Sequence, residues 1–192
     1  MSSVWFTSDW HIGHAAIIRH CHRPFADVEE MNETLIARHN EVVRDGDTVI
    51  HVGDFCWREQ LVAPTLKRLR GAKHALVAGN HDKVHACHKK HEKATRRYLS
   101  YGFAEVLMRT TFVFAHGIEA TICHLPYRHA DVADQRYLDM RPVDRGGWLI
   151  HGHCHEKWRV LDRQVNVGVD VWNFTPVHTD QLLAIIRRQV AA

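Results

Sequence analysis

The chain lacks the cysteine pattern that would build either a disulfide framework or a zinc site made of thiolates. Its 192 residues include five cysteines, an odd number, and none of them forms a Cys-x-x-Cys pair. A disulfide framework needs paired cysteines, and an all-thiolate zinc site needs closely spaced ones. We therefore expect neither of these features.

Long hydrophobic runs are also missing. No apolar stretch approaches the roughly 18–20 residues that a membrane-spanning helix needs, so we expect no membrane partner. Residues 1–9, MSSVWFTSD, have neither a basic segment nor a long apolar one, which predicts no signal peptide and a cytoplasmic location. Hydrophobic content of 45% and charged content of 24% are ordinary for a globular protein, and the length predicts one domain over residues 1–192.

An excess of charge of one sign is absent too. The net charge is +3 and the isoelectric point lies near 8.7, which permits an anionic substrate without requiring nucleic acid. Basic residues cluster between Lys89 and Arg97. We interpret this cluster as the solvated face of a helix. Nucleic-acid binding by the same helix is the alternative, and a steep dependence of binding on salt would distinguish it.

The first half of the sequence predicts alternating strands and helices. Short apolar runs predict buried strands at 4–9, 48–54 and 74–80. Amphipathic patterns predict helices at 27–43, 61–69 and 84–101, and the first of these opens at a capping box, Asp27-Val-Glu-Glu30. The second half predicts mostly short strands, and a final helix begins at Thr179. The predicted strands lie at 103–108, 111–115, 120–124, 148–153, 158–162 and 165–169. This order is typical of a mixed α/β domain whose parallel strands come first.

Histidine is the residue in excess, with 18 copies, and several of them coincide with predicted strand ends. In open α/β sheets, ligands bind at the carboxyl ends of the strands. Oxygen or imidazole ligands follow five predicted strands: Asp9 and His11, Asp54, Asn80, His124, and His153 and His155. Seven ligands are too many for one ion that keeps a water, and they suit two ions that share a carboxylate. Oxygen and imidazole without thiolate favour Mn, Fe, Zn, Ni or Co.

In chain order these stretches resemble the calcineurin-like metallophosphoesterases, whose pattern is DxH, GD, GNHD or GNHE, a lone H, and GHxH. The matching residues are Asp9-Trp-His11, Gly53-Asp54, Gly79-Asn-His-Asp82, His124 and Gly152-His-Cys-His155. The match therefore runs from residue 9 to residue 155. Residues 22–25 and 166–170 are also similar to stretches in small bacterial and phage members. The resemblance implies a four-layer α/β/β/α sandwich of mixed sheets with a dimetal site at the strand ends.

The resemblance also implies a cofactor of two divalent transition-metal ions, manganese first, and a role for each ligand. The first ion would be held by Asp9, His11, Asp54 and His155, with Asp54 bridging, and the second would be completed by Asn80, His124 and His153. Two ions roughly 3.5–4 Å apart clamp a phosphate and lower the pKa of bound water. By this resemblance a metal-bridging hydroxide would attack phosphorus in line.

The general acid implied by the resemblance is His81, which would protonate the leaving oxygen. Many phosphatase members carry an aspartate three residues after the bridging one, and here that position is Trp57. Asp82 could replace this aspartate as the partner of His81, or His81 could work without a carboxylate. Arg58 falls where protein phosphatases have a phosphate-binding arginine, and an exposed arginine is the alternative reading.

The substrate is expected to be a phosphate ester, with a nucleotide or a nucleic-acid end among the candidates. Arg23, Arg128 and Tyr127 are candidate substrate-binding residues. We expect cleavage of phosphodiesters to be favoured, because alkoxide leaving groups need the proton of His81. The alternatives are a phosphomonoesterase or protein phosphatase at the same site, and a catalytically silent protein of this fold that binds metal or nucleic acid.

Two other phosphate chemistries do not fit the sequence. Residues 11–14 read His-Ile-Gly-His, a string that nucleotidyl transferases use, but no basic KMSKS-like loop follows it. A cysteine phosphatase needs His-Cys-x5-Arg, and the arginine position is Asp27 after Cys21 and His129 after Cys123. The functional letters of residues 8–14 are therefore expected to be Asp9 and His11.

Overall fold

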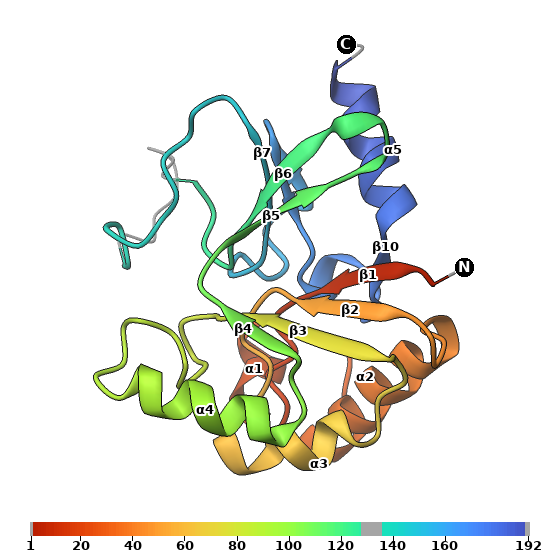
Figure 1. The fold of residues 1–192 in the computed structure, drawn as a ribbon. Helices are drawn as coiled ribbons and strands as arrows, with labels where there is room; N and C mark the ends of the chain where they lie inside the picture. Colours follow the sequence, from red (N-terminus) through yellow and green to blue (C-terminus); the bar gives the residue numbers. More distant parts are fainter. Residues whose placement is uncertain (1, 128–135, 191–192) are drawn as a thin grey trace.

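Two five-stranded sheets form the centre of the computed structural model, which describes residues 2–127 and 136–190 (Figure 1). The first sheet has the order β10-β1-β2-β3-β4. Its strands β1 to β4 are parallel, and β10 pairs antiparallel with β1. Their bounds are β1 Val4–Thr7, β2 Thr48–His51, β3 Lys73–Val77, β4 Glu105–Leu107 and β10 Val177–His178.

The second sheet has the order β5-β6-β7-β9-β8. Its central pairs β6–β7 and β7–β9 are parallel, and both outer pairs are antiparallel. Both sheets are therefore mixed. The bounds are β5 Thr110–Val113, β6 Glu119–Ile122, β7 Trp148–His151, β8 Val160–Leu161 and β9 Gln164–Asn166.

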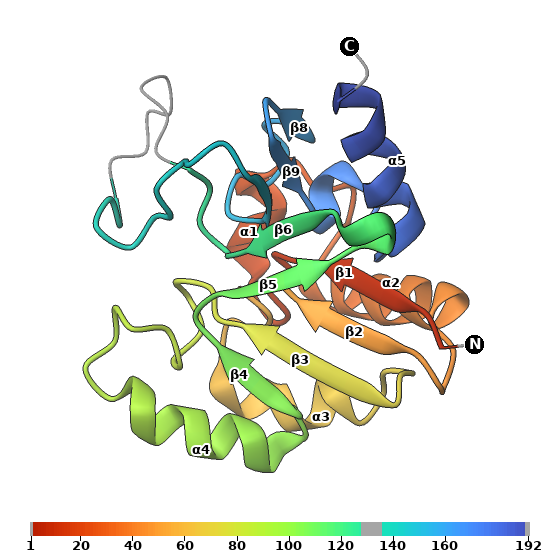
Figure 2. The ribbon, with the colours of Figure 1, turned by 45° about the horizontal axis from the view of Figure 1, so that its top comes forward.

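Helices cover the first sheet on the side away from the second. Figures 1 and 2 show α2, α3 and α4 beneath the first sheet and α5 on its other side, next to the second sheet. The predicted four-layer α/β/β/α fold of mixed sheets is confirmed, and α5 contacts β1 and β10 at the edge of the first sheet. None of the helices in residues 2–127 and 136–190 has the length and apolar character that a membrane crossing requires. The bounds are α1 Ala15–His20, α2 Val28–Val42, η1 Glu59–Leu61, α3 Val62–Leu66, α4 His91–Tyr101, η2 Ala115–Gly117, η3 Val169–Val171 and α5 Thr179–Val190.

Helix α2 begins at the capping residues that the sequence predicts. The Asp27 carboxylate accepts a hydrogen bond from the Glu30 amide at 2.8 Å, and the Glu30 carboxylate accepts one from the Ala26 amide at 2.6 Å. These bonds satisfy backbone N–H groups that a helix start leaves without partners. The helix then buries Met31 and Leu35 against the sheet.

Helix α4 begins later than predicted, at His91 instead of residue 84. Residues 82–91 form successive turns in which the amides of His85, His88 and His91 each donate to a carbonyl three residues earlier. The His88 ring also bonds the Asn80 carbonyl at 3.0 Å. These bonds hold the segment close to Asn80 as a series of turns, and the regular helix begins only after them.

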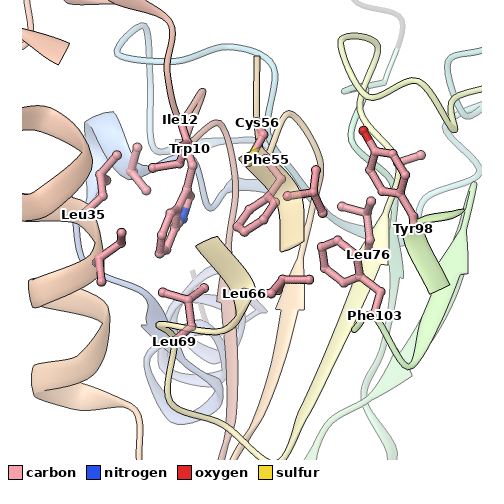
Figure 3. Close-up of a cluster of buried hydrophobic side chains, with 14 of the residues drawn as sticks. Trp10, Ile12, Leu35, Phe55, Cys56, Leu66, Leu69, Leu76, Tyr98 and Phe103 are labelled. Atoms are coloured by element: carbon pink, nitrogen blue, oxygen red, sulfur yellow. The ribbon is translucent and has the colours of Figure 1, made fainter. Parts of the chain in front are cut away.

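Two apolar clusters hold the layers together. The cluster between the first sheet and its helices is shown in Figure 3 and contains Trp10, Phe55 and Leu76. The second cluster lies between the two sheets and extends to α5, with members such as Phe6 and Ile150. Trp10 directly follows Asp9 and is almost fully buried, so its packing anchors the loop that carries the predicted ligands.

Three histidines that belong to no predicted site lie buried together beneath the first sheet. The His51 and His74 rings are joined by a 3.1 Å hydrogen bond, and the His39 ring bonds the Arg70 carbonyl at 2.8 Å. Burial is the main cause that lowers the pKa of His39 and of His74 to about 4, and it lowers that of His51 well below 6.5. The fold therefore accommodates their neutral forms.

The free energy of unfolding is expected to fall as the pH drops from about 6.5 to about 4. A histidine whose pKa is depressed by folding stabilises the fold fully above its unfolded pKa, and the contribution is lost on protonation. His39 and His74 should each contribute on the order of 3 kcal/mol to this loss. Urea unfolding at several pH values measures it. His39→Gln should make the dependence shallower and exposed His20→Gln should not; equal slopes in both variants would refute the assignment.

Candidate metal centre

The predicted ligands lie in loops that directly follow strands of both sheets. β1, β2 and β3 end two or three residues earlier than the apolar runs predict, so Asp9, Asp54 and Asn80 stand in the loops beyond them. His124 follows β6 and His153 follows β7. Backbone hydrogen bonds tie the first two loops side by side, since the Asp9 amide donates to the Gly53 carbonyl at 3.0 Å.

The backbone at these ligands adopts a conformation that L-residues rarely occupy. φ is +58° at Asp9, +52° at His11, +53° at Asp54, +71° at His153 and +49° at His155. Such left-handed conformations cost energy in residues other than glycine, and they gather where function requires a particular geometry. They also explain why β1 and β2 end before Asp9 and Asp54, because a residue with positive φ cannot continue a strand. The loops are thus shaped to aim these side chains inward.

One group of ligand atoms converges around the Asn80 side-chain oxygen. His153 Nδ1 lies 2.9 Å from Asn80 Oδ1, and His124 Nε2 lies 3.2 Å from it. The same His124 Nε2 is 3.4 Å from Asp54 Oδ2. Asn80, His124 and His153 are therefore gathered together, with Asp54 next to His124, and their binding of a second ion stays a prediction.

A second group converges around Asp9. His155 Nε2 lies 3.8 Å from Asp9 Oδ1, and His11 Nε2 lies 3.5 Å from Asp54 Oδ2. Potential ligand atoms of Asp9, His11 and His155 all lie within 4.8 Å of one another. Asp54 Oδ2 thus lies close to the imidazoles of both His11 and His124.

Unpartnered ring nitrogens and neighbouring buried carboxylates make this group of residues suitable for binding metal ions. His11 is buried, and neither of its ring nitrogens has a hydrogen-bond partner among the described residues. Unsatisfied buried polar atoms are costly, so such atoms call for a ligand. Asp9 and Asp54 are both buried, and the charge of Asp54 is one of the causes that raise the pKa of Asp9. Cations between them would remove that repulsion.

The pKa values of the metal-free chain show where positive charge is stabilised. Against the effect of burial, Asp54 raises the pKa of His124 to about 9. Burial is likewise opposed at His155, where Asp9 and Asp170 raise the pKa to about 11. Protonated imidazoles thus supply positive charge beside the carboxylates, and metal binding would displace these protons because a ligating histidine must be neutral.

Glycines next to the ligands allow the loops to approach one another closely. A Cβ added to Gly79 would overlap the Asp54 carboxylate, and one added to Gly152 would overlap the side chains of Ser8 and Asp9. Only glycine has room at such positions. The glycines of the motifs therefore serve the packing of the ligand loops.

Arg23 lies in the interior behind the ligands, which contradicts the prediction that it binds substrate. Its guanidinium bonds both carboxylate oxygens of Asp170, at 2.7 and 2.9 Å, and the backbone carbonyls of Asp9 and Trp10. Asp170 Oδ2 in turn accepts from His155 Nδ1 at 3.1 Å. Arg23 and Asp170 therefore form a buried pair behind His155, one of the predicted ligands.

Asp170→Asn is expected to weaken metal binding about 10–100-fold, because partners that orient ligating histidines have effects of that size. Asp170 fixes the His155 proton on Nδ1 and so leaves Nε2 free to face the metal position. Competition with a chelator measures the affinity. Asp45→Asn, at an exposed carboxylate, is the matched control. Unchanged affinity in the Asp170 variant would show that Asp170 does not orient His155.

His81 stands beside the ligands with aromatic rings around it. Its amide donates to Asp54 Oδ1 at 2.8 Å, and its ring centroid lies 5.3 Å from that of His11 and 5.4 Å from that of Trp57. Burial is the main cause that lowers the pKa of His81 below 6.5. The imidazole is half-buried, so one part of it can meet a substrate.

Asp82 does not act as the missing partner of His81. One of its carboxylate oxygens accepts from the amides of Asp54 and Gly79, both at 2.8 Å, and the other accepts from the amide of Phe55 at 3.2 Å. The residue is fully buried beneath the ligand loops. Its carboxylate therefore pins these loops together, which corrects the catalytic role that the sequence left open for it.

The remaining predicted residues lie apart from the ligands or outside the described structure. Tyr127 is buried, and its hydroxyl donates to the Gly147 carbonyl at 3.2 Å. It lines a cavity of about 510 Å³ whose described lining includes none of the seven ligands, and its contact with substrate stays a prediction. Arg58 is exposed just before η1, and its role stays a prediction. Arg128 lies outside the described residues.

Comparison with known proteins gives relatives that match along nearly the whole chain. The uncharacterized protein MJ1445 of Methanocaldococcus jannaschii is 32% identical over 197 residues, covering 98% of this chain and 93% of that protein. The Gene 66 protein of Mycobacterium phage D29 is 32% identical over 183 residues, covering 90% of each. The crystal structure of AQ665, a protein of unknown function from Aquifex aeolicus, has a TM-score of 0.72 at 23% identity and covers 97% of this chain and 100% of that one.

At 23% identity the likeness to AQ665 shows the fold alone. The phage relative agrees with the predicted similarity to small phage members of the family. The family itself follows from a sequence profile, which spans residues 2–182 and so includes every predicted ligand. Metal-dependent hydrolysis of phosphate esters is the chemistry that this match supports, in agreement with the clustered ligands. The chain belongs to the calcineurin-like phosphoesterase family.

Proposed function

We propose that this protein hydrolyses phosphodiesters with two divalent transition-metal ions, manganese foremost and Fe, Zn, Ni or Co as alternatives. The observation that carries the proposal is the convergence of two groups of ligand atoms on either side of Asp54. A bridging carboxylate with imidazoles on both sides suits a pair of ions, and oxygen and nitrogen donors suit transition metals. When bound, such a pair activates water and neutralises the charge of a phosphate.

The chain itself supplies positioning and a proton. Asp54 fixes His81 through the hydrogen bond from the His81 amide, so the imidazole is held next to the place where a phosphate would lie. His81 would donate a proton from its ring to the leaving oxygen as the bond to phosphorus breaks. General acids of this kind contribute roughly 10²- to 10⁴-fold. The attacking water would approach from the side opposite the leaving oxygen.

The charges near the site support a diester as substrate. A monoester carries a second negative charge, which phosphatases commonly meet with extra cationic side chains. Of the arginines predicted to bind phosphate, Arg23 is bound to Asp170 inside the fold. A diester has one negative charge and a leaving alkoxide that needs a proton, so it matches a site that offers His81 as a proton donor and in which Arg23 is already paired with Asp170.

The test is a comparison of two substrates with metal-reconstituted protein. Dialysed protein is loaded with Mn²⁺, and the hydrolysis of bis-p-nitrophenyl phosphate and p-nitrophenyl phosphate is followed. We expect metal-dependent turnover of both, with a higher kcat/KM for the diester. Faster turnover of the monoester would make the protein a phosphomonoesterase. No turnover of either compound with metal bound would leave a silent metal-binding member of the family.

A further inference from the structure

Four aromatic rings form a closed circuit beside the metal centre. The ring centroids are 5.4 Å apart for His11 and His14, 3.8 Å for His14 and Trp57, 5.4 Å for Trp57 and His81, and 5.3 Å for His81 and His11. The circuit therefore joins a metal ligand, His11, to the general acid, His81. Neither His14 nor Trp57 is a predicted ligand, and the proposed reaction gives neither of them a task.

Trp57 is exposed, whereas Trp10 and Tyr127 are buried. Its relative exposure is 39%, whereas Trp10 is 1% and Tyr127 is 4% exposed. The His14 ring lies parallel to the indole, with an interplanar angle of 3°, and covers one of its faces. The exposed area of Trp57 therefore belongs to its other face and its edges. A large aromatic surface held open to solvent beside a reacting site is a natural place for a ligand.

The indole is held in place by the two loops that carry the ligands. The Trp57 amide donates to the Ile12 carbonyl at 2.9 Å, and Ile12 pairs with Cys56 in a parallel bridge. Leu61 packs directly over Gly13, where a Cβ would overlap it. Trp57 and His14 thus sit on neighbouring loops whose spacing is fixed, so the stacked pair offers a preorganised surface.

We propose that the exposed face of Trp57 stacks on a planar ring of the leaving group, so that the protein prefers phosphate esters of nucleosides. The inference rests on the proposed function, because it places the phosphate at the metal centre and the leaving oxygen next to His81. The Trp57 indole adjoins the His81 ring, so a group attached to the leaving oxygen would lie next to the indole. Stacking recognises any base through its flat face and does not read its identity.

The experiment compares two ligands that share a phosphate-like group and differ in a base. Adenosine 5′-phosphonate and ribose 5-phosphonate, in which carbon replaces the bridging oxygen, cannot be hydrolysed at that position. Their binding to Mn²⁺-loaded protein is measured by isothermal titration calorimetry. We expect the adenosine compound to bind about tenfold more tightly, the size of effect that one stacked base gives.

Variants of Trp57 separate stacking from a structural role. Trp57→Leu should bring the two affinities together by weakening the adenosine compound alone, and Trp57→Phe should keep part of the preference. Leu99→Ala, at an exposed apolar residue of α4, should change neither. The proposal is overturned if the wild-type protein binds both ligands equally or binds neither, or if Trp57→Leu weakens both to the same degree.

The outcome is distinguishable from failure of the proposed function. A protein that prefers the adenosine compound but hydrolyses no phosphate ester would retain the stacking site and lose the proposed activity. A protein that hydrolyses the diester without the binding preference would retain the activity and lose the stacking site. Binding by calorimetry and turnover of bis-p-nitrophenyl phosphate are therefore measured on the same preparations.

Discussion

Replacement of Asp54 by asparagine is expected to reduce hydrolysis of bis-p-nitrophenyl phosphate to background and to weaken the binding of both metal ions. Asp54 is buried and stands between the imidazoles of His11 and His124, at 3.5 and 3.4 Å. Loss of its charge therefore affects both metal positions at once. Residues that merely orient ligands cost 10–100-fold in metal affinity, so at least about 100-fold is expected for the shared ligand.

The substitution is conservative for the fold, which makes its result informative. An asparagine keeps an oxygen that can accept the hydrogen bond from the His81 amide. Asp45→Asn removes an equal charge from an exposed position and is the matched control. Circular dichroism of both variants should equal that of the wild type. Retention of two bound ions and of activity in Asp54→Asn would show that Asp54 does not bridge.

His81→Ala is expected to keep both metal ions and to lose about 10²- to 10⁴-fold in kcat for a dinucleoside monophosphate. The leaving alkoxide of that substrate needs a proton, and the His81 ring is a half-buried imidazole that lies beside the ligands without joining either group. Bis-p-nitrophenyl phosphate releases an acidic phenol that needs little protonation. Its turnover should therefore fall much less in the same variant.

The contrast between the two substrates identifies the role of His81. A ligand or a general electrostatic contributor would affect both substrates alike, whereas a general acid affects the poorer leaving group more. His85→Ala, a buried histidine four residues away, is a control for the loss of an imidazole from the same segment. Loss of metal from His81→Ala, or equal loss with both substrates, would refute the assignment of His81 as acid.

The elements that sequence predicted well are those specified by local pattern. The Asp27 capping residues, the buried strands and the order of ligands after strand ends are written in adjacent residues, and the structure confirms the fold that they imply. The ligand motifs could be placed because parallel strands bring their carboxyl ends to one edge of the sheet. The strand topology thus brings motifs that are distant in the sequence to one place in the structure.

Contacts between distant residues could not be predicted in the same way. Arg23 and Asp170 are 147 positions apart, so nothing in either stretch shows that the arginine turns inward. The role of Asp82 depends on three backbone amides that meet only in the folded loops. The late start of α4 depends on the bond between His88 and the Asn80 carbonyl, which a helical pattern does not reveal.

The stacking of His14 on Trp57 is another contact between distant residues that the sequence could not predict. The sequence marks Trp57 as a departure from the phosphatase pattern, but it does not say what stands beside the indole. Only the parallel course of the loops after β1 and β2 places His14 against it. The position of both loops therefore shows that Trp57, in place of the aspartate, forms an aromatic surface next to His81.

Metal content per chain tests the central claim most directly. The protein is stripped with chelator, loaded with Mn²⁺, dialysed and analysed by plasma mass spectrometry together with its protein concentration. The two groups of ligand atoms on either side of Asp54 predict two ions per chain, and Asp54→Asn should retain fewer. A wild-type protein that retains one ion or none would contradict the account.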